Sequence, residues 1–154
     1  MRPLNKNASK IFYELMEQLG KRCAVKIDNS PNEFMAVNID RIGPQVVAIA
    51  HNYVQCGDVM ADPDMMFYIQ KDTGLVYPFS YQLSSLGTYQ ESIVFDEDGQ
   101  PLSFYPKMQK DHAVFASQWM KNIKAQQGPN FSPRMDGQIM EAPIGADEQA
   151  LSGA

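Results

Sequence analysis

The sequence lacks the long apolar run that marks a membrane protein. Its longest unbroken apolar stretch, Val46 to Ala50, is far shorter than the roughly 20 residues that a helix needs to cross a bilayer. The residues after Met1 carry positive charge, but no apolar segment of a signal peptide follows them. We therefore expect a cytoplasmic protein that has no membrane partner.

Cysteine is scarce. Cys23 and Cys56 are the only two, and they lie in separate predicted strands without the spacing of metal ligands. Two reduced thiols, as in cytoplasmic proteins, are the favoured interpretation, and a single disulfide is the alternative. The cysteines thus predict neither a disulfide framework nor a zinc site.

Positive charge is rare in the middle of the chain. Residues 27–106 contain eleven acidic side chains and two basic ones, whereas residues 1–26 and 107–125 are each net basic. A protein that binds duplex nucleic acid without sequence preference needs a basic stripe to replace the counterions of the phosphates. We therefore do not expect a nucleic acid partner.

The order of periodic segments predicts an α+β domain. Apolar residues recur at helical spacing after Asn7, a predicted N-cap, up to Gly20, and a second helix should run from Pro106 to about Gln126. Between them, alternating or β-branched runs separated by turn residues predict an antiparallel sheet of about five or six strands, packed by the two helices. The six predicted strands are Ala24–Asp28, Glu33–Asp40, Gln45–Gln55, Met65–Gln70, Leu75–Leu83 and Thr88–Phe95, and Leu102–Tyr105 is a candidate for a last short strand.

The length and the last helix set the predicted domain boundary. A chain of 154 residues has the usual size of one domain, and we expect that domain to span residues 1–126. Residues 127–154 have too few apolar positions to offset the entropy of ordering them, which predicts a flexible acidic tail. The second helix should bury one apolar face, made of Phe115, Ala116, Trp119, Met120 and Ile123.

Polar side chains gather around a predicted turn at residues 57–64. Oxygen ligands suit hard divalent cations, so carboxylates beside a strand histidine allow a metal-assisted hydrolase or nuclease-like enzyme as one interpretation. The spacing matches no calcium loop, and aspartates that cap a turn through backbone N–H groups are the favoured interpretation, with no resident metal. The candidate binding residues are His51, Gln55, Asp58, Asp62, Asp64, Gln90 and Glu91.

Motifs of catalysis are missing. The order of residues gives no Ser-His-Asp arrangement, and there is no glycine-rich phosphate loop, so we predict no cofactor and lean against an enzyme. His51 shares its strand face with Val47 and Ile49, which favours a structural histidine over a general acid or base.

The stretch Ala50–Phe67, with the pattern AHxxxQxGDxMxDPxMxF, resembles a bacterial domain family of unknown function. The family pattern has asparagine where Cys56 stands and glutamate where Asp64 stands, so we expect no ligand that depends on an amide at position 56. The resemblance covers most of residues 10–125. It also rests on Ile27–Asn29, Ile42–Gly43, Pro78–Ser80, Gly87–Glu91 and the helix that holds Phe115 and Trp119.

The resemblance implies the kind of genetic element that encodes the protein, but it implies no reaction. Members of the family are small proteins or modules encoded largely on plasmids, phages and integrated elements, which implies an accessory or host-interaction role such as counter-defence. Together with the acidic middle of the chain, this favours a non-enzymatic protein that binds a host or element-encoded protein, through the acidic sheet region or an exposed strand edge. The sequence leaves the oligomeric state open.

Two alternatives to that function remain. The first is the metal-dependent enzyme described above, which requires the carboxylates near His51 to converge. The second is a small-ligand or peptide pocket between sheet and helices, lined by Tyr53, Phe67, Tyr89 and Trp119 with His51 or Gln55 at its rim. A closely packed core at that place would exclude the pocket.

Overall fold

The computed structural model describes residues 1–29, 35–128 and, for the backbone alone, 139–141. The two long helices are α1 (Lys6–Leu19) and α2 (Pro106–Gln127), which confirms the predicted α+β class. None of the described helices is long and apolar enough to cross a membrane. The other elements are β1 (Ala24–Ile27), β2 (Ala36–Gly43), β3 (Val46–Gln55), β4 (Asp58–Ile69), β5 (Val76–Leu83), the short 3₁₀ helix η1 (Ser84–Leu86), β6 (Thr88–Glu91), β7 (Ile93–Phe95), β8 (Pro101–Phe104) and β9 (Ile139–Glu141).

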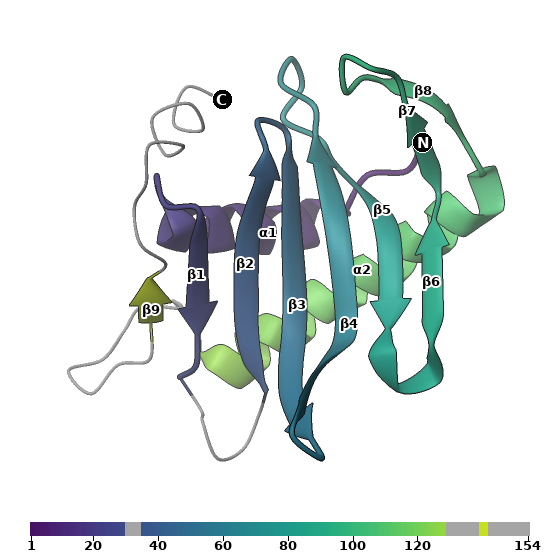
Figure 1. Ribbon diagram of the computed structural model, residues 1–154. Helices are drawn as coiled ribbons and strands as arrows, with labels where there is room; N and C mark the ends of the chain where they lie inside the picture. Colours follow the sequence, from purple (N-terminus) through teal and green to yellow (C-terminus); the bar gives the residue numbers. More distant parts are fainter. Residues whose placement is uncertain (30–34, 129–138, 142–154) are drawn as a thin grey trace.

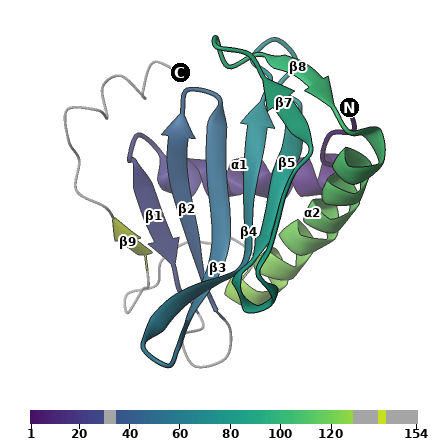
Figure 2. The same cartoon turned by 45° about the vertical axis from the view of Figure 1, so that its right-hand side comes forward.

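Strands β1 to β6 form an antiparallel meander in chain order, and β9 pairs with β1 at one edge. Strands β7 and β8 form a separate hairpin. Both helices lie on the same face of the sheet, and none of the described helices covers the other face (Figures 1 and 2). We call these the helix face and the open face of the sheet.

The ends of α1 follow from their capping residues. The side chain of Asn5 accepts a hydrogen bond of 2.8 Å from the Ala8 N–H, which makes Asn5 the N-cap in place of the predicted Asn7. At the other end, Gly20 has a positive φ of 59° and its N–H donates to the Met16 carbonyl, as predicted for a glycine that ends a helix.

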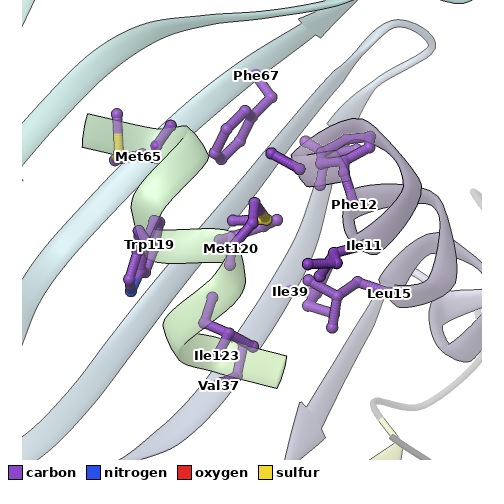
Figure 3. Close-up of a cluster of buried hydrophobic side chains, with 14 of the residues drawn as sticks. Ile11, Phe12, Leu15, Val37, Ile39, Met65, Phe67, Trp119, Met120 and Ile123 are labelled. Carbon is purple, nitrogen blue, oxygen red and sulfur yellow. The ribbon is translucent and has the colours of Figure 1, made fainter. Parts of the chain in front are cut away.

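The main hydrophobic core lies between the helix face and the two helices. Phe12 and Leu15 of α1, and Met120 of α2, are fully buried against the sheet (Figure 3). The sheet contributes residues that alternate along each strand, because every second side chain of a strand points to the same face. They include Val25, Ile27, Val37, Ile39, Val47, Ile49, Met65 and Phe67.

A second, smaller core lies near the β7–β8 hairpin. Tyr68, Tyr77, Phe79 and Ile93 are buried there, with Phe95 packed against Phe79 at a ring distance of 4.9 Å. The ladder between β4 and β5 is irregular between Met66 and Phe67, opposite Ser80 and Pro78, where proline cannot donate a ladder hydrogen bond.

Four local predictions are wrong. The predicted turn at residues 57–64 is the first half of β4, and the two-residue turn Cys56–Gly57 joins β3 to it. Strand β2 continues through residues 41–43, where a break was predicted. The predicted strand Thr88–Phe95 divides at Ser92 between two sheets, and Phe115 is 40% exposed instead of buried, although the other four predicted contact residues of α2 are buried.

The predicted tail falls mostly outside the described residues. Within it, the backbone of residues 139–141 pairs antiparallel with β1. The boundary at residue 126 and the flexibility of the tail remain predictions, and α2 ends one residue beyond that boundary, at Gln127.

Candidate functional site

The predicted site residues do not form one group, because β3 and β4 place them on both faces of the sheet. His51 lies on the helix face, 4% exposed, and the Trp119 indole Nε1–H donates to its Nδ1 at 3.3 Å. Burial lowers the pKa of His51 to about 4, so the ring is neutral at pH 7. With Nδ1 accepting, the proton lies on Nε2, a buried donor that has no partner among the described residues.

The carboxylate of Asp62 accepts hydrogen bonds from neighbouring side chains. Its Oδ2 accepts hydrogen bonds from the Ser85 hydroxyl at 2.9 Å and from the Tyr53 hydroxyl at 3.4 Å. These bonds connect the β3–β4 hairpin to the 3₁₀ helix η1, where the Ser84 hydroxyl also accepts the Ala61 N–H. Asp62 therefore fixes the connection after β5, which is a structural role that the predicted turn did not anticipate.

Gln90, an exposed residue of β6, makes contact with a buried serine–histidine pair. Its Oε1 is 3.1 Å from Nε2 of His112, whose Nδ1 is 2.8 Å from the Ser92 hydroxyl. Ser92 is fully buried and His112 is 3% exposed, so this pair lies within the packed interior. The hydrogen bond of this serine–histidine pair links α2 to the residue at which the chain leaves the main sheet.

The remaining polar residues lie far from this helix-face group. Gln55 and Asp58 form the last pair of the β3–β4 hairpin and are both exposed. Over the described part of the chain, no group of three or more His, Cys, Asp or Glu side chains could hold a metal ion. The convergence that the metal-dependent enzyme requires is therefore not present among those residues.

Between the sheet and the helices, where a pocket was predicted, the described residues form a packed core. Phe67 and Trp119, two of its expected walls, are 0% and 4% exposed and belong to the packed core shown in Figure 3. Tyr89, a third expected wall, lies on β6 and lines a cavity on the open face. The prediction was wrong because the position of a strand in the sequence does not say which face the helices will cover.

The open face carries a shallow hollow that spans β1 to β6. Ala24 on β1 and Ala48 on β3 line a cavity of about 450 Å³, and Ala36 on β2 lines a second cavity of about 400 Å³. Asp40 lines both cavities, so they adjoin. The small side chains here are alanines. Their neighbours in the sequence point to the helix face and are large, and this difference in size makes the open face concave.

Two carboxylates stand on opposite sides of β3 in this hollow. Asp40 on β2 is opposite Ala48, and Asp64 on β4 is opposite Ala50. Burial raises the pKa of Asp40, and burial together with the negative charge of Asp40 raises the pKa of Asp64. Both shifts show that the charged form of these carboxyl groups is disfavoured in the folded domain.

Tyr89 and Glu91 extend the acidic wall onto β6. They are opposite Gln82 and Ser80 of β5, and the Tyr89 hydroxyl donates to the Glu91 carboxylate. This hydrogen bond, burial and the charges of Glu91 and Asp64 raise the pKa of Tyr89 to about 12. Tyr89 is nevertheless 53% exposed, so its ring is available to a partner.

Two cations border the hollow without pairing with its carboxylates. The Arg41 guanidinium donates to the Gly20 carbonyl at 2.6 Å, at the end of α1. Lys26 lines the second cavity, beside Asn38, which binds the Asn52 amide oxygen. Both cysteines are free thiols, as expected, and Cys23 lies at the margin of the hollow.

Of the seven predicted residues, Asp64 lines the hollow and Glu91 bonds to a tyrosine that does. The sequence analysis did not single out Asp40, which follows the buried Ile39 on the other face of β2. The recoverable signal was a set of alanines that adjoin buried apolar residues in the sequence, Ala24 before Val25, Ala36 before Val37 and Ala48 between Val47 and Ile49.

Comparison with known proteins gives one match. No curated protein and no solved structure matches the chain. The family model described as Domain of unknown function (DUF6908) matches residues 6–128, which span the two helices and every strand between them. The chain therefore belongs to this family of domains of unknown function.

Proposed function

We propose that this domain is a non-enzymatic binding module that holds a partner protein on the open face of its sheet. The observation that carries the proposal is the hollow itself, in which alanines form the floor and polar side chains form the walls. A sheet that only had to fold would gain stability from larger side chains at these positions, because they would bury more apolar surface.

The carboxylates of the hollow support the same proposal. A carboxyl group whose pKa is raised in the folded state destabilises the fold at neutral pH. Residues that cost stability are expected where binding needs them, since binding sites trade stability for function. Asp40 and Asp64 fit that expectation, whereas Asp62 and His112 are held by hydrogen bonds within the fold.

The proposed module acts in the cytoplasm as an accessory protein of a mobile genetic element, and its partner is a host or element-encoded protein. These points come from the family resemblance. An accessory role and a partner protein do not require catalysis. This agrees with a site whose polar groups are spread over a concave surface.

Site-specific photo-crosslinking tests the proposal. A benzoylphenylalanine at Gln82, which lines the hollow, is compared with one at Gln118, an exposed position on α2, in the full chain expressed in a bacterial host. We expect a discrete protein adduct from position 82 and none from position 118.

Filling the hollow is the second arm of this experiment. Ala48→Leu should abolish the adduct at position 82 while circular dichroism shows an unchanged fold. Equal adducts from both positions, or an adduct that survives Ala48→Leu, would overturn the proposal, because the partner would then contact another surface.

A further inference from the structure

We infer that the hollow of the open face receives an arginine side chain of the partner protein. This inference rests on the proposed function and adds the chemistry of the contact. It is argued from the shape of the hollow, from the aromatic ring on its wall and from the unmatched negative charge on both sides of β3.

The positions of Asp40 and Asp64 leave room for a cationic group between them. They belong to the two strands that flank β3, at register positions two residues apart along it. Strand spacing places their Cα atoms about 10 Å apart across the sheet and about 7 Å along it. Because only Ala48 and Ala50 stand between them, the gap is open to a group that enters from the solvent.

The walls of the hollow favour arginine over lysine. Met66 and Ala48 offer apolar contact to an aliphatic stem, and the exposed ring of Tyr89 offers a surface on which a planar guanidinium stacks. A guanidinium also has five donors in a rigid fork, enough to reach carboxylates on two sides, whereas an ammonium is a compact charge.

The two described cations that border the hollow do not serve this purpose. Arg41 bonds to the carbonyl at the end of α1, and Lys26 forms no ion pair with Asp40 within the described chain. The raised pKa of Asp64, to which the Asp40 charge contributes, agrees with a pair of acids that lacks a counter-charge. An incoming guanidinium would supply it.

Nuclear magnetic resonance titration with a defined peptide tests the inference. The probe is acetyl-Gly-Arg-Gly-Arg-Gly-amide, and its counterparts replace both arginines by lysine or by citrulline, which keeps the shape but removes the charge. We expect shifts of the amides of Ala24, Ala48 and Ala50, with binding at least about tenfold weaker for citrulline and about threefold weaker for lysine.

A variant pair with equal charge change separates a site from general attraction. Asp40→Asn with Asp64→Asn should weaken binding of the arginine peptide at least about tenfold. Glu97→Gln with Asp98→Asn removes the same charge from the exposed β7–β8 turn and should change it less than about twofold. Equal losses in the two variants, or equal binding of the citrulline peptide, would overturn the inference.

The crosslinking experiment keeps the two proposals distinct. If the adduct at position 82 persists in the Asp40→Asn, Asp64→Asn variant, the binding module stands and the arginine contact is wrong. If the arginine peptide binds in the hollow but position 82 gives no adduct, the proposed function fails while the chemistry of the hollow stands.

Discussion

The two faces of one sheet differ in what they place at neighbouring positions. On the helix face, Ile39 and Ile49 are fully buried and contribute to the core. One residue further along β2, and one residue back along β3, the open face presents Asp40 and Ala48. The first face explains why the domain folds, and the second has features that folding alone does not require. This contrast directs attention to the open face for function.

The largest expected effect comes from comparing substitutions at two adjacent residues of β2, one on each face of the sheet. Ile39→Ala removes a fully buried side chain and should lower the free energy of unfolding by about 2–5 kcal/mol, because it leaves a cavity in the main core. Asp40→Ala, one position along, should change it by less than about 1 kcal/mol. Urea unfolding followed by the fluorescence of Trp119 measures both. Similar losses for the two variants would remove the contrast between the faces.

The next effect concerns the buried histidine of the helix face. The pKa of His51 is about 4 in the folded state against 6.5 in the unfolded chain, so the unfolded state binds more protons between these values. Stability should therefore fall as pH drops from about 6.5 to about 4, by up to about 3 kcal/mol.

Unfolding measured across that pH range checks this prediction, with His51→Gln as the comparison. The glutamine can still accept the Trp119 N–H but does not titrate, so the variant should show a smaller slope. Some slope should remain, because burial also lowers the pKa of His112. A wild-type slope in the variant would mean that His51 is not the group that titrates.

The carboxylates of the open face should act in the opposite direction. Their pKa values are raised in the folded state, so the stability that they cost appears as pH rises above their ordinary value of 3.8. Asp40→Asn with Asp64→Asn should therefore stabilise the domain at pH 7, by less than about 1 kcal/mol because solvent screens both groups. The difference should shrink near pH 3.8. Destabilisation at pH 7 would show that these acids serve the fold.

The smallest effect lies at the tip of the β3–β4 hairpin. Both Val54 and Val59 are more than two-thirds exposed there. Cys56 has a positive φ of 52° and precedes Gly57, the geometry in which a two-residue hairpin turn prefers Asn-Gly. Cys56→Asn should raise the free energy of unfolding by about 0.5 kcal/mol and with it, slightly, the melting temperature. Cys56→Val should lower the melting temperature. The turn geometry therefore explains the asparagine that the family pattern has at position 56, without a role in ligand binding.

Periodicity predicted most of the fold because it reflects local geometry. The helical spacing of Ile11, Phe12 and Leu15 and the alternation of Val37 with Ile39 depend only on the repeat of the backbone. The segment 57–64 failed because Gly, Asp and Pro are frequent in turns, whereas here they extend a strand whose pairing partner, β3, supplies the hydrogen bonds. Tertiary pairing outweighed local preference.

The site was harder to predict than the fold. His51 and Asp64 looked like one group because they are close in sequence, but β3 and β4 direct them to opposite faces. Asp40 and Tyr89 looked unrelated because almost fifty residues separate them, yet the five neighbouring strands β2 to β6 bring both to the hollow. Sequence proximity was therefore a poor guide to which side chains meet.

By itself, the sequence determined the class of the fold, the two amphipathic helices, most of the buried strand residues and the acidity of the middle of the chain. These depend on composition and on short-range periodicity, which every segment carries within itself. Only the tertiary structure decided which face the helices cover and therefore where the hollow lies. Both helices could have packed on either side of a meander, and the choice follows from the summed burial of large side chains from many strands.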